Sequence, residues 1–197
     1  MRSRELAAGL GAAIIAVGCA TQQYVGTPAE PTPRVKFGKP MTDADIAPWD
    51  IDIRTPDGKG LPVGRGTVAE GKTVYDAKCT VCHGADAKGG PVYGTMVGGI
   101  GSFKTSTRVL TPGSMYPYAP ILFDYIRRAM PMDRPQSLTA NEVYAVSAYL
   151  LNLNGIIPAD AVMDQNTLVQ VQMPNRNGFI IDDRPDTKAV RCMTNCK

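Results

Sequence analysis

The strongest hydrophobic pattern in the chain follows residues 139–142, where Thr139 and Glu142 form a capping box of the kind that satisfies free backbone donors at a helix start. Apolar side chains then recur every three or four positions, which is the spacing of one helix face. They are Val143, Val146, Leu150 and Leu153, with Tyr149 beside them. Asn154 and Gly155 are typical of a helix end. The pattern predicts a helix over this stretch with one buried face.

A second helix is predicted over residues 68–79, because residues 67–70 form another capping box. Gly71 lies inside this helix, where glycine lowers helix propensity. That cost is explained if another helix crosses closely at this position. A shorter helix is predicted over residues 121–129, with Pro120 at its first position.

The remaining segments lack a helical period. Residues 84–119 are rich in glycine and read as a long loop, which is unusual unless the loop wraps a ligand. Prolines divide residues 20–63, which are expected to form a spacer and then an extended segment at residues 49–53, packed on the domain. Residues 156–197 are expected to be an irregular tail with one short helix or turn near residues 160–168.

The N-terminus has the features of a targeting segment. Arg2 and Arg4 precede a run of small and apolar residues that is too short to span a bilayer. The run ends at Cys19, in a sequence that resembles a bacterial lipoprotein signal with a lipidated cysteine. An ordinary cleaved signal, with Cys19 in a flexible tail, is the alternative. Lipidation predicts a periplasmic protein anchored on a membrane surface.

These features divide the chain into four predicted regions. Residues 1–18 are a lipoprotein-type signal peptide, and residues 19–44 are a flexible tether. Residues 45–155 form one domain, with an extended lead-in and a core at about 64–155. Residues 156–197 form a C-terminal tail that wraps the domain.

Composition agrees with a loop-rich domain and excludes one class of partner. Of 197 residues, 20 are glycine and 16 are proline, so much of the chain is expected to be loop. The net charge is +3, without a basic run or stripe. Nucleic acid is therefore not expected as a partner.

The candidate chemistry lies at Cys79, Cys82 and His83, which form a C-x-x-C-H run. In this run two thiols attach a haem covalently, and the adjacent imidazole is the proximal iron ligand. His83 is the only histidine in the sequence, so the run predicts one haem c whose other axial ligand is not histidine. A zinc site and a redox dithiol are the alternatives. Zinc needs more ligands than lie nearby, and a redox dithiol is typical beside a βαβ pattern, which the sequence lacks.

Methionine is the expected second axial ligand. Met130 and Met132 lie between two predicted helices, where a loop can fold back over the haem. Pro131 stiffens the loop after Met130, so Met130 is the predicted ligand and Met132 the alternative, ahead of Met96 and Met115. His/Met ligation raises the reduction potential and leaves no open position for substrate, which predicts single-electron transfer. A haem protein with a labile methionine would instead suit catalysis or gas sensing.

Two further cysteines, Cys192 and Cys196, lie near the C-terminus. Outside the cytosol such a pair is expected to form a disulfide. A redox-active or metal-binding thiol pair is the alternative.

With its haem motif in place, the chain resembles the class I c-type cytochromes. In that family an N-terminal helix with a glycine crosses a C-terminal helix with an aromatic residue, and Gly71 and Tyr149 fall at those positions. The resemblance implies an all-α fold, the class I cytochrome c fold around one covalently bound haem. The extended Pro-rich N-terminal segment and the irregular C-terminal tail would be additions to it.

A closer resemblance is to the cytochrome c subunit of sulfane dehydrogenase, in the thiosulfate-oxidising Sox system, or of a related sulfite dehydrogenase. It covers roughly residues 45–186 and supports Met130 as ligand. The segments that carry it are residues 49–53, 56–62, 116–119, 123–131, 137–139, 144–146, 148–154, 174–175, 178–179 and 182–185.

This resemblance implies an electron-transfer subunit that does not itself carry the substrate chemistry. It would accept electrons from a molybdenum-containing sulfane or sulfite dehydrogenase subunit and pass them to a soluble cytochrome c. A free-standing, lipid-anchored electron shuttle is the alternative.

Several other residues are candidates for contacts with haem or partner. The resemblance favours one or two of four residues as partners of the haem propionates, against plain packing. These are Tyr116, Tyr118, Arg127 and Arg128. Trp49 is expected to pack on the domain rather than to cover a haem edge or lie at an interface. Lys78 and Lys88 flank the haem motif and are expected to be solvated charges, with steering of an acidic partner as the alternative.

Overall fold

The computed structural model describes residues 38–55 and 57–183. The predicted signal peptide, Cys19, Cys192 and Cys196 lie outside the described residues. The chain divides into two units, residues 1–40 and 41–197, and every helix and strand described below belongs to the second. Its α-helices are α1 (Asp43–Ile46), α2 (Val68–Lys78), α3 (Thr80–His83), α4 (Pro112–Met115), α5 (Ala119–Ala129) and α6 (Ala140–Leu153). Three 3₁₀ turns cover Ala85–Ala87, Ser102–Lys104 and Leu168–Gln170, and two strands cover Arg65–Thr67 (β1) and Val162–Asp164 (β2).

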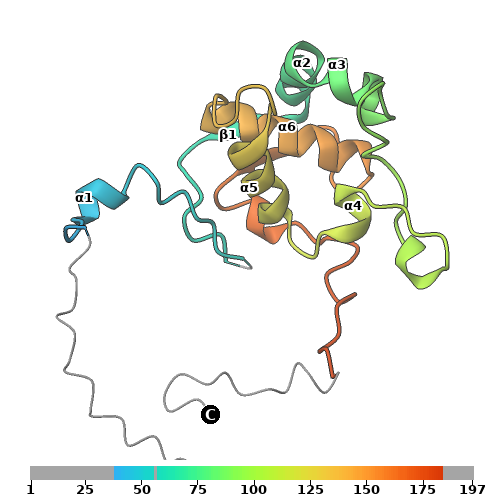
Figure 1. Cartoon of the computed structure of the whole chain (residues 1–197). Helices are drawn as coiled ribbons and strands as arrows, with labels where there is room; N and C mark the ends of the chain where they lie inside the picture. Colours follow the sequence, from blue (N-terminus) through green and yellow to red (C-terminus); the bar gives the residue numbers. More distant parts are fainter. Residues whose placement is uncertain (1–37, 56, 184–197) are drawn as a thin grey trace, which may run out of the picture. The chain divides into compact units, whose positions relative to one another are not determined.

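Helices α2 and α6 cross at the centre of the fold (Figure 1). A methyl group placed on Gly71 of α2 would lie 1.9 Å from the carbonyl oxygen of Ala145 and 2.8 Å from Cβ of Tyr149. One placed on Gly66 of β1 would lie 2.3 Å from the backbone nitrogen of Ala145. Glycine is therefore required where α2 and β1 approach the backbone of α6. The close crossing predicted at Gly71 is confirmed.

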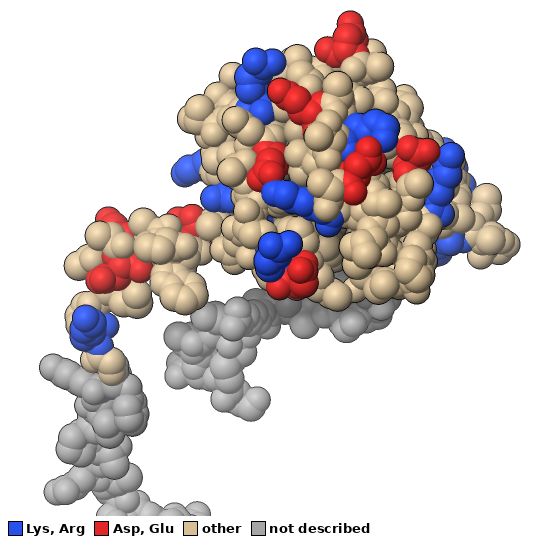
Figure 2. Space-filling view, turned by 90° about the horizontal axis from the view of Figure 1, so that it is seen from above, with Lys and Arg blue, Asp and Glu red and all other residues tan. Residues whose placement is uncertain are grey.

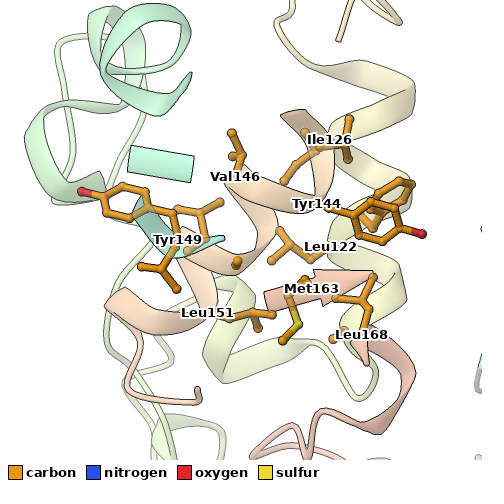
Figure 3. Packing of buried hydrophobic residues seen from close by; sticks show 14 of the residues in the cluster. Leu122, Ile126, Tyr144, Val146, Tyr149, Leu151, Met163 and Leu168 are labelled. Atoms are coloured by element: carbon orange, nitrogen blue, oxygen red, sulfur yellow. The ribbon is translucent and has the colours of Figure 1, made fainter. Parts of the chain in front are cut away.

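Helix α6 is the element around which the core is built. Both of its sides carry buried residues, and Figure 3 shows Tyr144 and Tyr149 leaving it in different directions. Tyr149 packs against Tyr75 of α2 with ring centroids 5.3 Å apart, while Tyr144 packs against Phe123 of α5 with centroids 4.4 Å apart. A helix buried on most of its surface lies inside a fold rather than on it. Thus α6 holds α2 and α5, the two helices that lead to the candidate ligands.

The capping boxes predicted for α2 and α6 are both present. Two helix boundaries differ from the predictions, and a further helix was not predicted. Helix α2 ends at Lys78, one residue early, because Cys79 links it to the short helix α3. Helix α5 begins at Ala119, and its proline occupies the second helical position, which also lacks an internal amide partner. Helix α4 lies inside the predicted loop, where Thr111 and Ser114 form a capping box of their own.

The C-terminal segment is not irregular throughout: the prediction is wrong for the strand at residues 162–164, whereas the 3₁₀ turn at Leu168–Gln170 lies close to the expected short helix or turn. Strand β2 pairs antiparallel with β1, and Gly66 lies opposite Met163. The segment also buries four apolar side chains in the core: Met163, Leu168, Val171 and Met173. Figure 3 shows Met163 and Leu168 beside Leu122 and Leu151. A three-residue strand has too short a pattern to be predicted without its distant partner.

The lead-in also differs from its prediction at one residue. Ile53 packs against the core, as an extended packed segment should, but the side chain of Trp49 is 81% exposed. The predicted packing of Trp49 is therefore wrong. Helix α1 just before it buries no side chain. No helix among the described residues has the length and apolar character needed to cross a membrane.

Candidate haem site

A cavity of about 740 Å³ lies beside the end of α2 and the segment after α5. This volume is typical of a pocket for a cofactor-sized ligand. Cys79, Cys82 and His83 line it, and so do Met130 and Met132. The structure thus brings the predicted haem-attachment residues and the two leading candidate methionines to one cavity, which Met96 and Met115 line as well.

Local hydrogen bonds arrange the C-x-x-C-H run. The amides of Cys82 and His83 both donate to the carbonyl of Cys79, at 3.2 and 3.0 Å. Residues three and four apart share one face of such a turn, so both thiols and the imidazole lie on the same side. The next loop closes tightly: a methyl group on Gly84, where φ is 74°, would lie 2.0 Å from the carbonyl oxygen of Gly89. The glycines that follow the motif are therefore part of its support.

Burial sets the chemistry of these side chains. It raises the pKa of the Cys79 thiol to about 11, whereas a redox-active C-x-x-C needs a lowered pKa. It also lowers the pKa of His83, so the imidazole is neutral at pH 7, as a metal ligand must be. The Nδ1 atom of His83 is buried without a hydrogen-bond partner among the described residues. Both thiols are unpaired. These features fit a haem and disfavour a redox dithiol.

The zinc alternative finds no support either. Within residues 38–55 and 57–183, no three His, Cys, Asp or Glu side chains converge where they could hold a metal ion. Zinc in a structural site takes four such ligands.

The two candidate methionines differ in their surroundings. Met130 caps the C-terminus of α5, its amide donates to the carbonyl of Ile126 at 3.0 Å, and its side chain packs against the core. Met132 is 60% exposed, and its sulfur accepts a hydrogen bond of 3.0 Å from the hydroxyl of Tyr93. The ring of Tyr93 stacks on His83 with centroids 5.2 Å apart. Tyr93 was not predicted as a site residue, since a lone tyrosine in a glycine-rich loop carries no pattern.

Comparison with known proteins agrees with this site. The family model for cytochrome c matches residues 68–154. The chain is 36% identical to one in the crystal structure of the sulfane dehydrogenase SoxCD from Paracoccus pantotrophus, with a TM-score of 0.70 and 83% of each chain covered. The chain belongs to the cytochrome c family. No curated protein sequence matches it.

This cytochrome is an electron-transfer haem protein of the class I fold, and its cofactor is one haem c. Haem iron supplies reversible one-electron chemistry. Cys79 and Cys82 would hold the haem covalently, and His83 stands next to them as the residue that would bind its iron. The protein then has to exclude water, fix the ligands and place the cofactor near its surface.

Of the four residues predicted to contact the haem propionates, only Tyr116 lines the cavity. Burial raises the pKa of its phenol, so it stays neutral and able to donate. Tyr118 instead lies under the guanidinium of Arg176, 4.2 Å from its ring centroid. Arg128 faces another direction, as its guanidinium binds Asp124 at 2.9 Å and the carbonyl of Ile51 at 3.2 Å. Arg127 does not line the cavity either.

The cationic side chains that do line the cavity are Lys78 and Arg134. Lys78 forms an ion pair with Glu142, with 2.5 Å between nitrogen and oxygen. Arg134 lies largely exposed beside Asp133. Arg134 was missed at the sequence level, although its place just after the two methionines is a signal that could have suggested it. Lys88 lies at the surface near Asp86, as expected for a solvated charge.

Proposed function

We propose that this cytochrome is a periplasmic monohaem electron-transfer subunit, anchored by a lipid on Cys19. It accepts electrons from a molybdenum-containing sulfane or sulfite dehydrogenase subunit and passes them to another cytochrome c. The supporting observation is the similarity to a chain of a sulfane dehydrogenase over 83% of both chains. That coverage exceeds the span of the family model, so the similarity is not limited to the haem-binding core.

His83 and Met130 are the proposed axial ligands. Met130 is favoured because it is partly buried at the end of α5, whereas the sulfur of Met132 is bound to Tyr93. Ligation by both residues leaves no open iron position, which suits electron transfer and not gas binding.

The ligation is tested by absorption spectroscopy of the oxidised protein. Met130→Ala should abolish the methionine–iron charge-transfer band, and the matched variant Met132→Ala should keep it. If Met132→Ala removes the band instead, the assignment of the ligands is reversed. Ready carbon monoxide binding by the reduced wild type would indicate a labile methionine and a catalytic or sensing haem.

The partner is tested by affinity purification of the native cytochrome. Co-purification of stoichiometric molybdenum, with haem reduction on adding thiosulfate or sulfite, is the expected result. Absence of a molybdenum-containing subunit would leave the free-standing shuttle as the better function.

The anchor and the disulfide are tested on the mature chain. Mass spectrometry should find an acylated N-terminus at Cys19, and an unacylated one would refute the anchor. Thiol titration of denatured protein should find Cys192 and Cys196 only after reduction.

A further inference from the structure

The segment of residues 41–52, here called the acidic arm, exposes apolar side chains that the other described residues do not cover. Residues 41–50 are all exposed. Among them are Met41, Ile46 and Trp49, and the indole is 81% exposed. Tryptophan is enriched among the residues that dominate binding energy at protein interfaces. Exposed apolar side chains gathered in one short segment are candidates for a contact surface.

The acidic arm is ordered by its own backbone rather than by burial. Thr42 and Asp45 form a complete capping box at the start of α1. After α1, the amides of Trp49 and Asp50 both donate to the carbonyl of Ile46, at 2.8 and 3.0 Å. Ile46 and Trp49 are therefore held in successive turns of one ordered segment. Because α1 buries none of its side chains, its apolar residues add nothing to this chain's own core.

The charge of the acidic arm limits which kinds of partner can bind it. The acidic arm carries four aspartates and no lysine, arginine or histidine: Asp43, Asp45, Asp50 and Asp52. Figure 2 shows acidic side chains gathered on this segment. An anionic membrane surface would repel them, and so would the acidic arm of a second copy. A protein surface with an apolar pocket and a basic rim is complementary to both features.

The base of the acidic arm is fixed to α5, the helix that Met130 caps. Arg128 of α5 donates to the carbonyl of Ile51 at 3.2 Å and forms an ion pair with Asp52 at 3.2 Å. Asp124, one turn earlier in α5, binds the same guanidinium. The acidic arm therefore joins the domain beside the last turn of α5, directly before the proposed iron ligand Met130.

The similarity to the sulfane dehydrogenase chain also includes this segment. A stretch that covers 83% of 197 residues must begin before residue 41 and end after residue 154. We infer that the acidic arm is the docking segment for the dehydrogenase subunit that reduces this cytochrome, with Trp49 in an apolar pocket and the aspartates facing basic side chains. This inference rests on the proposed function.

The experiment measures reduction of the full-length, haem-loaded cytochrome by the molybdenum-containing fraction that reduces the wild type with thiosulfate or sulfite. Trp49→Ala should raise the half-saturating cytochrome concentration about tenfold or more, with the maximal rate unchanged. Val63→Ala is the matched control, because Val63 is 88% exposed but lies outside the acidic arm. It should match the wild type.

Charge is tested with a double variant, Asp43→Asn with Asp50→Asn. Asp45 is left in place because its carboxylate accepts from the amide and hydroxyl of Thr42. The double variant should raise the half-saturating concentration several-fold and reduce its dependence on salt. Reduction by ascorbate and the methionine–iron band should be the same in every variant, which shows that the haem site is intact.

Other outcomes overturn the inference. An unchanged half-saturating concentration for Trp49→Ala would show that the acidic arm does not dock. If Trp49→Ala instead weakens binding to phosphatidylglycerol–phosphatidylcholine vesicles and leaves the rate of reduction by the partner unchanged, the acidic arm is a membrane contact. If no molybdenum-containing fraction reduces even the wild type, the proposed function fails and this inference with it.

Discussion

Replacing Gly71 by alanine tests the helix crossing on which the haem domain depends. The added methyl group would lie 1.9 Å from the carbonyl oxygen of Ala145, so two backbones must move apart by more than 1 Å to reach ordinary contact. Overpacking of this kind costs about 1–3 kcal/mol, and a clash with backbone belongs at the upper end. Alanine regains about 1 kcal/mol of helix propensity. The expected net loss is about 2 kcal/mol, or a drop of about 4–8 °C in Tm for a chain of this size.

Far-UV circular dichroism during guanidinium unfolding is the suitable assay, because Trp49 is already exposed and reports little as a fluorophore. Ala69→Gly is the matched control. Ala69 lies exposed in the same helix, so this change removes propensity alone and should cost at most about 1 kcal/mol. A Gly71→Ala protein as stable as the wild type would refute the close contact between α2 and α6.

Three further substitutions test other contacts. The Asn154 side chain accepts a hydrogen bond from the amide of Gly98 at 3.0 Å and donates to two backbone carbonyls. Asn154→Ala should therefore lower the free energy of unfolding by about 2 kcal/mol and speed hydrogen exchange of the Gly98 amide. Unchanged exchange at Gly98 would contradict this. The ion pair with Lys78 lowers the pKa of Glu142, so its stabilisation is present above the unfolded pKa of about 4.5 and is lost as pH falls through the folded value. Glu142→Gln should therefore lose a few tenths to about 1 kcal/mol at pH 7 and show a weaker acid dependence of unfolding free energy. Burial raises the pKa of Tyr144 to about 12, so stability should fall between about pH 10 and 12, and less so in Tyr144→Phe, as denaturation at alkaline pH will show.

The helices and the proximal half of the site were predictable because their signals are local. The capping boxes at Thr67 and Thr139 each lie within four residues, and both are present. The C-x-x-C-H run is a single turn whose geometry is set by hydrogen bonds to Cys79. Gly71 was informative for a different reason. Glycine is unfavourable inside a helix, so its presence there indicated a close contact with another element of the fold.

What sequence reasoning missed depends on partners far along the chain. Met163 is buried in the core because β2 pairs with β1, a strand that lies nearly one hundred residues earlier in the chain. Arg128 looked like a propionate partner, but Asp124 and Asp52 compete for its guanidinium. Trp49 was expected to pack on the domain because it opens a short period-2 alternation, but that pattern does not show which of its residues reach the core.

The two sides of the haem site therefore depend on different parts of the fold. His83 is presented by a turn closed within its own segment. Met130 is placed by α5, which packs on α6 and on the 3₁₀ turn at Leu168–Gln170 in the C-terminal segment. That segment is held in turn by the pairing of β2 with β1, directly before α2. The proposed second ligand thus depends on long-range packing at both ends of the domain, and the similarity to the dehydrogenase chain also extends beyond the span of the family model.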